Sequence, residues 1–128
     1  MNLLLDTHIF LWAIWGSDRL STTARQAFLD PENTLYFSMA SYWEICIKLS
    51  LGKLELAPDW QKVFDREMAF NGIRWLAIEK EHCQGNVDLP FIHSDPFDRL
   101  LIAQAKQEDF TILTGDRNIP KYDVDTLT

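Results

Sequence analysis

The chain has 128 residues, 47% hydrophobic and 12% aromatic, which suits one folded domain over residues 1–128 and argues against intrinsic disorder. It contains no apolar run of the about 20 residues that a membrane span needs, no signal-peptide pattern and no paired cysteine motif, so we expect a cytoplasmic protein without a disulfide framework or zinc site. The net charge of −7 argues against a basic nucleic-acid-binding surface, although five of the nineteen acids stand at positions that one site could share.

Strand and helix signals alternate along the first half of the chain. The apolar run Leu3-Leu4-Leu5 predicts a short buried strand that ends at Asp6. A helix is expected from Thr7 to the break at 16–18, and Ser21 can cap the next one. The expected elements of this half are strands at 3–5 and 35–37 and helices at 7–15, 21–29 and 38–52.

The second half continues the alternation and defines the fold class. We expect helices at 59–70, 79–87 and 95–107, strands at 73–76 and 110–114, and a fifth strand at 122–124. Such alternation favours a three-layer α/β/α fold with a mainly parallel sheet of four to five strands. In these sheets ligands bind beyond the carboxyl ends of the strands.

Two acids of the first half have ordinary structural explanations. Asp6 can cap the helix that begins at Thr7. Glu44 completes a capping-box pattern with Ser41 and stands four residues before Lys48, a spacing typical of a helical ion pair. Taken alone, neither acid identifies a functional site.

The expected positions of the acids in the fold indicate a shared site. Asp95 is a helix cap before Pro96, Asp98 follows in the first helical turn, and Asp116 lies in a turn after a strand. Asp6 and Asp116 follow strands, while Glu44 and Asp98 lie in the early turns of helices that follow the strand edge, so all four are expected on one rim of the sheet. Crowded carboxylates repel one another unless a hard divalent cation lies between them.

A carboxylate-bound Mg²⁺ or Mn²⁺ points to phosphoester cleavage by a metal-activated water. No side chain offers itself as a neutral-pH base for that water. A phosphatase working through an aspartyl phosphate would need a second aspartate two residues after Asp6, where this chain has His8. His93 is expected near the site, making a loop hydrogen bond. The five tryptophans are expected in the core or at an interface, with base stacking as the alternative.

These segments resemble the PIN domain, and within it the VapC-like toxins. The matching motifs, which extend over nearly the whole chain, are Leu4-Leu5-Asp6-Thr7-His8, Ser41-Tyr42-Trp43-Glu44-Ile45, Asp95-Pro96-Phe97-Asp98-Arg99 and Thr114-Gly115-Asp116. Gly115 and Asn118-Ile119-Pro120 depart from the bulkier residues expected around the fourth acid, which puts the place of Asp116 in question.

The resemblance implies an endoribonuclease toxin that depends on Mg²⁺ or Mn²⁺, forms a homodimer and is inhibited by a cognate antitoxin. It assigns the metal-binding and catalytic acids to Asp6, Glu44, Asp98 and Asp116. Thr7 or Ser41 would supply a supporting hydroxyl group, and Asp95 a fifth carboxylate. The alternatives are a metal-dependent DNA nuclease and a catalytically silent acidic module that binds a basic partner.

Overall fold

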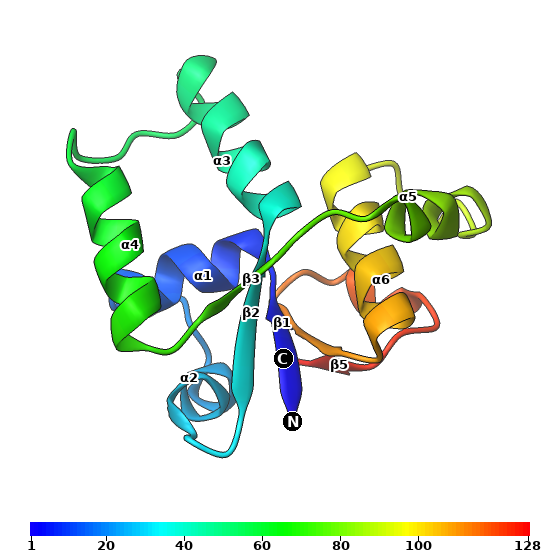
Figure 1. Ribbon diagram of the computed structural model, residues 1–128, viewed down its shortest axis with the longest axis horizontal. Helices are drawn as coiled ribbons and strands as arrows, with labels where there is room; N and C mark the ends of the chain where they lie inside the picture. The colour runs from blue at the N-terminus through cyan, green and yellow to red at the C-terminus, as the bar shows by residue number, and fades with distance from the viewer.

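Five short parallel strands form the sheet in the computed structural model, which describes residues 1–128 (Figure 1). The strand order is β3-β2-β1-β4-β5, so the first strand of the chain lies at the centre of the sheet. The strands are β1 (Asn2–Leu5), β2 (Thr34–Ser38), β3 (Arg74–Leu76), β4 (Thr111–Leu113) and β5 (Thr126–Leu127). This sheet confirms the predicted fold class, with every strand pair parallel.

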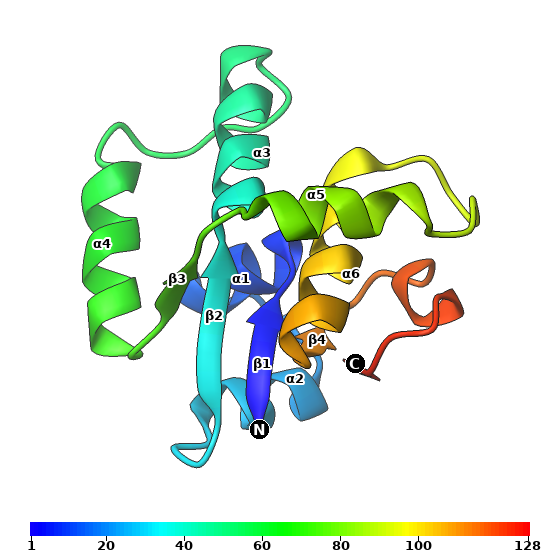
Figure 2. The same cartoon turned by 45° about the vertical axis from the view of Figure 1, so that its right-hand side comes forward.

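Helices cover both faces of the sheet, which gives the three expected layers (Figures 1 and 2). One face carries α1 (Thr7–Ile14), α2 (Thr22–Leu29) and α4 (Trp60–Phe70), and the other carries α5 (Lys80–Val87) and α6 (Pro96–Glu108). Helix α3 (Met39–Ser50) continues directly from β2 and projects beyond the end of the sheet. None of the helices is both long and apolar enough to span a membrane.

The run Leu3-Leu4-Leu5 forms the centre of both cores because successive strand side chains point to opposite faces. Leu3 and Leu5 pack with Phe37 in the core beneath α1 and α4, while Leu4 packs with Ile102 in the core beneath α6. All three leucines are fully buried. Burial of each leucine contributes about 2 kcal/mol to the stability of the fold. The strand that they anchor ends at Leu5, so Asp6 follows directly at its carboxyl end.

The expected strand at 122–124 is wrong, because this stretch makes local turns. A 3-10 helix, η1 (Ile119–Lys121), precedes it, and the amide of Tyr122 donates to the carbonyl of Ile119. The amide of Val124 donates to the carbonyl of Tyr122, so neither amide is free to pair with β4. The fifth strand instead forms four residues later, at β5.

Candidate active site

The parallel register brings two acids together at the carboxyl end of the central strands. Leu5 of β1 pairs with Leu113 of β4, so Asp6 and Thr114 follow side by side. The Thr114 hydroxyl donates to Oδ2 of Asp6 and accepts a hydrogen bond from the backbone amide of Asp116 at 2.9 Å. Thr114 therefore joins the first and the last of the four predicted acids.

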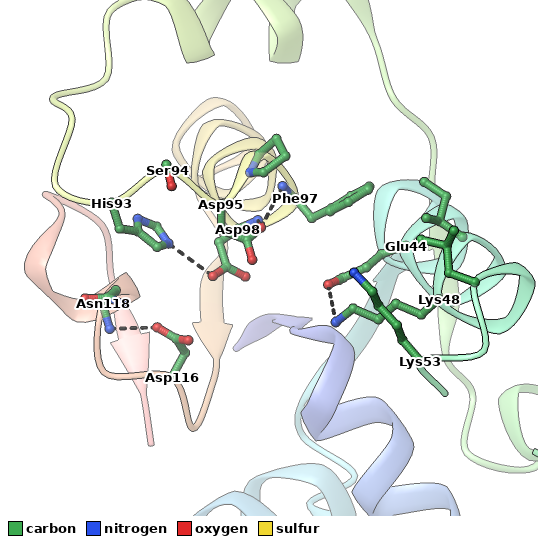
Figure 3. Close-up of a pocket in the computed structure, with 13 residues that line it drawn as sticks. Glu44, Lys48, Lys53, His93, Ser94, Asp95, Phe97, Asp98, Asp116 and Asn118 are labelled. Atoms are coloured by element: carbon green, nitrogen blue, oxygen red, sulfur yellow. Dashed lines mark hydrogen bonds and ion pairs between the residues drawn. The ribbon is translucent and has the colours of Figure 1, made fainter. Parts of the chain in front are cut away.

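Three of the four predicted acids line one cavity of about 640 Å³ at this end of the sheet (Figure 3). Asp6 does not line it: this residue is only 4% exposed, and it connects to the cavity wall through Thr114 and Asp116. Oδ1 of Asp6 also accepts from the amide of Ile9 at 2.8 Å, which confirms the predicted cap. The charged and histidine residues along the wall are Glu44, Lys48, Lys53, His93, Asp95, Asp98 and Asp116.

Glu44 is held by two partners in the middle of the projecting helix α3. Its Oε1 accepts from the Thr7 hydroxyl at 2.6 Å, and its Oε2 lies 2.9 Å from Nζ of Lys48, which confirms the predicted ion pair. The predicted capping box is wrong because Ser38, not Ser41, caps α3. Ser41 lies within the helix, and its buried hydroxyl has no hydrogen-bond partner. Of the two predicted supporting hydroxyl groups, Thr7 therefore contacts an acid directly.

Asp95 and Asp98 have different roles at the start of α6. Oδ1 of Asp95 accepts from the amides of Phe97 at 2.9 Å and Asp98 at 3.0 Å, so Asp95 caps the helix as predicted. Burial raises the pKa of Asp98 to about 6, and the negative charges of Asp95 and Asp116 add to this effect. Burial also raises the pKa of Asp6 above its ordinary value. These shifts are typical of carboxylates crowded at a functional site.

His93 forms a link between Asp98 and a buried tyrosine. The Tyr122 hydroxyl accepts from Nη1 of Arg99 at 3.1 Å and from the amide of His93 at 3.2 Å. The hydroxyl group has two acceptors for its own proton, Nδ1 of His93 at 2.8 Å and the carbonyl of the same residue at 3.4 Å, and the shorter contact favours Nδ1. Nε2 of His93 consequently carries the other ring proton and donates to Oδ2 of Asp98 at 3.1 Å. This network favours the tautomer of His93 that is protonated at Nε2, and it orients the Asp98 carboxylate.

The packing of Trp12 explains why a glycine, Gly115, precedes the fourth acid. A Cβ atom on Gly115 would lie 3.3 Å from Cζ3 of Trp12, so the indole fills the space that a larger residue would take. Asp116 is not displaced, because its Oδ1 accepts from the amides of Asn118 at 2.7 Å and Ile119 at 3.3 Å. The carboxylate thus stays at the cavity wall despite the departure in sequence.

The acids share the cavity but do not yet surround a common point. As the side chains stand, no group of three acidic, histidine or cysteine side chains lies close enough to hold a metal ion. Glu44 points to Lys48, and Asp98 points to His93. The donor set nevertheless fits a hard divalent cation, because carboxylate oxygens are the preferred ligands of such an ion. Burial, with the added charges of Asp95 and Asp116, raises the pKa of Asp98, and a bound cation would offset this cost.

Comparison with known proteins assigns the chain to a family. Residues 3–125 match the model of the PIN domain. The chain belongs to the PIN domain family. No curated protein sequence matches it closely.

The PIN fold of this chain is shared with solved toxin–antitoxin structures. VapBC2 from Rickettsia felis, solved with a DNA fragment from its promoter, aligns with a TM-score of 0.74 and 15% identity over 99% of this chain and 98% of the other. VapBC-1 from Haemophilus influenzae aligns with a TM-score of 0.65 and 16% identity over 99% of this chain and 97% of the other. A toxin–antitoxin complex from Klebsiella pneumoniae aligns with a TM-score of 0.64 and 17% identity over 98% of this chain and 96% of the other. At these identities the likeness concerns the fold.

Three residues of this PIN site were missed or undervalued by the sequence analysis. Thr114 belongs to one of the matching motifs, and Tyr122 follows it in the chain, but neither was given a role at the site. Their partners lie 108 and 29 residues away in the chain. His93 was expected to make only a loop hydrogen bond, but it contacts Asp98 directly. Its spacing of five residues before an acid at a helix start was the available signal.

Proposed function

We propose that this PIN domain is a metal-dependent endoribonuclease and the toxin of a toxin–antitoxin pair. PIN domain membership supports a hydrolase that acts on nucleic acids and uses divalent ions. The observation that carries the proposal is the single cavity lined by Glu44, Asp98 and Asp116, with Asp6 tied to it through Thr114.

The four acids would hold Mg²⁺ or Mn²⁺, with Asp98 and Asp116 as the most accessible donors. When bound, such an ion supplies Lewis-acid activation of water and neutralises charge on the phosphate. The protein contributes orientation: His93 holds Oδ2 of Asp98, and Thr7 holds Oε1 of Glu44. Such supporting hydrogen bonds fix the direction of carboxylate ligands and tune their basicity.

Two lysines beside Glu44, across the cavity from Asp98 and Asp116, would bind the substrate backbone (Figure 3). Lys48 and Lys53 line the cavity that holds the acids, and Lys53 has no ion-pair partner. Lys48 pairs with Glu44 and would exchange this carboxylate for a phosphate when the carboxylate binds an ion. The local positive charge of these lysines would attract a phosphate group even though the whole chain carries a net charge of −7.

The test is cleavage of matched single-stranded RNA and DNA oligonucleotides with Mg²⁺, Mn²⁺ or EDTA. We expect RNA cleavage with either ion and none with EDTA, and we expect Asp6→Asn and Asp98→Asn to lose cleavage while remaining folded. Asp65→Asn, an exposed change on α4, is the control and should cut normally. Cleavage by Asp98→Asn at the wild-type rate would contradict the site. DNA cleavage alone, or ion binding without cleavage, would replace the proposal by a DNA nuclease or a silent acidic module.

The proposed partner is a cognate antitoxin, because the solved neighbours are toxin–antitoxin complexes. We also propose a homodimer, as the family resemblance implies. The product of the adjacent reading frame should suppress RNA cleavage when co-purified with this chain, and light scattering should give the mass of a dimer for the free protein. A monomer, or full activity in the complex, would contradict these two points.

A further inference from the structure

A second, smaller cavity adjoins the acidic cavity at Asp116. Its volume is about 190 Å³, against about 640 Å³ for the first, and Asp116 lines both. The smaller cavity lies beside the start of α1, which runs below the labelled residues in Figure 3. Its lining is His8, Trp12, Arg19, Gly115 and Asp116. Asp116 thus places the smaller cavity next to the acids, within reach of a substrate whose reacting group lies there.

An aromatic pair forms one side of this cavity. His8 and Trp12 stand one turn apart on α1, with ring centroids 5.6 Å apart and planes inclined by 35°. His8 is exposed, whereas Trp12 is half-buried and fixed against Gly115. The core does not need an exposed His8, and the pair offers a nearly preformed surface on which a planar group can stack. Aromatic surfaces of this kind hold unpaired nucleobases without regard to sequence.

Arg19 supplies a free cation at the same cavity. The residue is exposed, and its guanidinium group makes no hydrogen bond or ion pair within the chain. Guanidinium groups bind phosphate through two parallel hydrogen bonds. With Lys48 and Lys53 in the larger cavity, cations lie on both sides of the acids. This arrangement suits a polyanion that crosses Asp116 from one cavity to the other.

We propose that the smaller cavity is a nucleotide subsite, in which an unpaired base stacks on His8 and Trp12 while Arg19 binds a phosphate adjacent to the scissile one. The proposal rests on the proposed function and adds that the substrate is single-stranded next to the cleaved bond. Stacking requires a base that has left its helix, so a paired nucleotide cannot occupy the subsite.

The experiment uses a single-stranded oligoribonucleotide that spans a bond the wild type cleaves. Binding is measured by fluorescence anisotropy with Mg²⁺ on an Asp98→Asn background, with a series of RNAs in which each nucleotide flanking the bond is abasic in turn. The added variants are Arg19→Gln and His8→Ala. Arg74→Gln, an exposed arginine at the far end of the sheet, is the matched control, and thermal unfolding checks that each variant folds.

We expect Arg19→Gln to weaken binding about three- to tenfold and to reduce the slope of log K against log salt by about 0.7, the value for one phosphate contact on a single strand. Arg74→Gln should change neither. His8→Ala should weaken binding at least about fivefold, and this loss should vanish with the RNA that lacks one particular flanking base.

Three results would overturn the subsite. Arg19→Gln could bind with the wild-type affinity and salt slope, or His8→Ala could lose the same factor on every abasic RNA. The third is cleavage of the same bond at an equal rate when the flanking nucleotides are paired. A wild type that cuts no RNA would instead overturn the proposed function, and the subsite with it.

Discussion

Replacing Asp98 with asparagine should stabilise the protein while it abolishes cleavage. The folded protein holds this carboxylate in a partly buried position beside Asp95 and Asp116, and this environment raises its pKa to about 6. Asparagine has nearly the same shape and can still accept the hydrogen bond from His93, but it carries no charge. The variant therefore removes a cost of folding without removing a contact.

The expected gain follows from the difference in pKa between the folded and unfolded states. Raising the pKa from 3.8 to about 6 corresponds to about 3 kcal/mol when Asp98 is ionised. The side chain is 18% exposed, so solvent screening reduces this value, and we expect about 1–3 kcal/mol. The cost is absent below pH 3.8, where both states bind the proton, and complete above about pH 6. The gain from Asp98→Asn should thus be largest at pH 8 and about half as large at pH 5.

The assay is urea unfolding of the wild type and Asp98→Asn in EDTA at pH 8 and pH 5, followed by tryptophan fluorescence. Asp65→Asn, an exposed carboxylate on α4, controls for the change in net charge and should give no comparable gain at either pH. Equal stability of Asp98→Asn and the wild type at pH 8 would refute the reasoning. A gain that stays the same at pH 5 would refute its electrostatic origin.

Three further predictions concern the surroundings of the site. Gly115→Val should push Trp12 from its position and cost about 1–3 kcal/mol, measured as a lower unfolding midpoint; unchanged stability would contradict the packing. Tyr122→Phe removes the hydroxyl group beside Nδ1 of His93, so the ring should no longer prefer protonation at Nε2, and RNA cleavage should fall about 10- to 100-fold. ¹⁵N NMR should show the loss of the Nε2-protonated form. An unchanged ¹⁵N spectrum would contradict the chain of hydrogen bonds. Mg²⁺ at 100 times the dissociation constant of the wild type should raise the free energy of unfolding of the wild type by about 2.7 kcal/mol. The same concentration should stabilise Asp98→Asn by clearly less, and equal stabilisation would exclude Asp98 as a ligand.

The fold and the outline of the site were predictable because they depend on short-range patterns. The Leu3-Leu4-Leu5 run gave the central strand, and the positions of Asp6 and Asp116 after strands placed both acids on one rim. The rule that parallel strands present their carboxyl ends together needs no knowledge of the strand order. The strand order and register, however, decide that Thr114 rather than another residue stands beside Asp6.

The errors arose where local composition and tertiary contacts disagree. Tyr122 and Val124 are typical of strands, yet the tyrosine turns inward and its hydroxyl joins Arg99 and His93. Ser41 matched a capping box by spacing alone, but α3 begins three residues earlier, immediately after β2. For Tyr122 the deciding partners lie on other elements, and no window of a few residues contains them. The cap of α3, in contrast, lies only three residues before Ser41, where a helix start was also expected.

The central place of β1 also governs when the site can come into existence during synthesis. The first strand leaves the ribosome early, but the hydrogen bond between Thr114 and Asp6 closes a loop of 108 residues. The partner strand β4 is therefore available only after the 108 residues that separate Thr114 from Asp6 have been made. Until then Asp6, Glu44 and Asp98 have no Asp116 beside them. The cluster of the four acids is thus complete only when β4 joins the sheet beside β1.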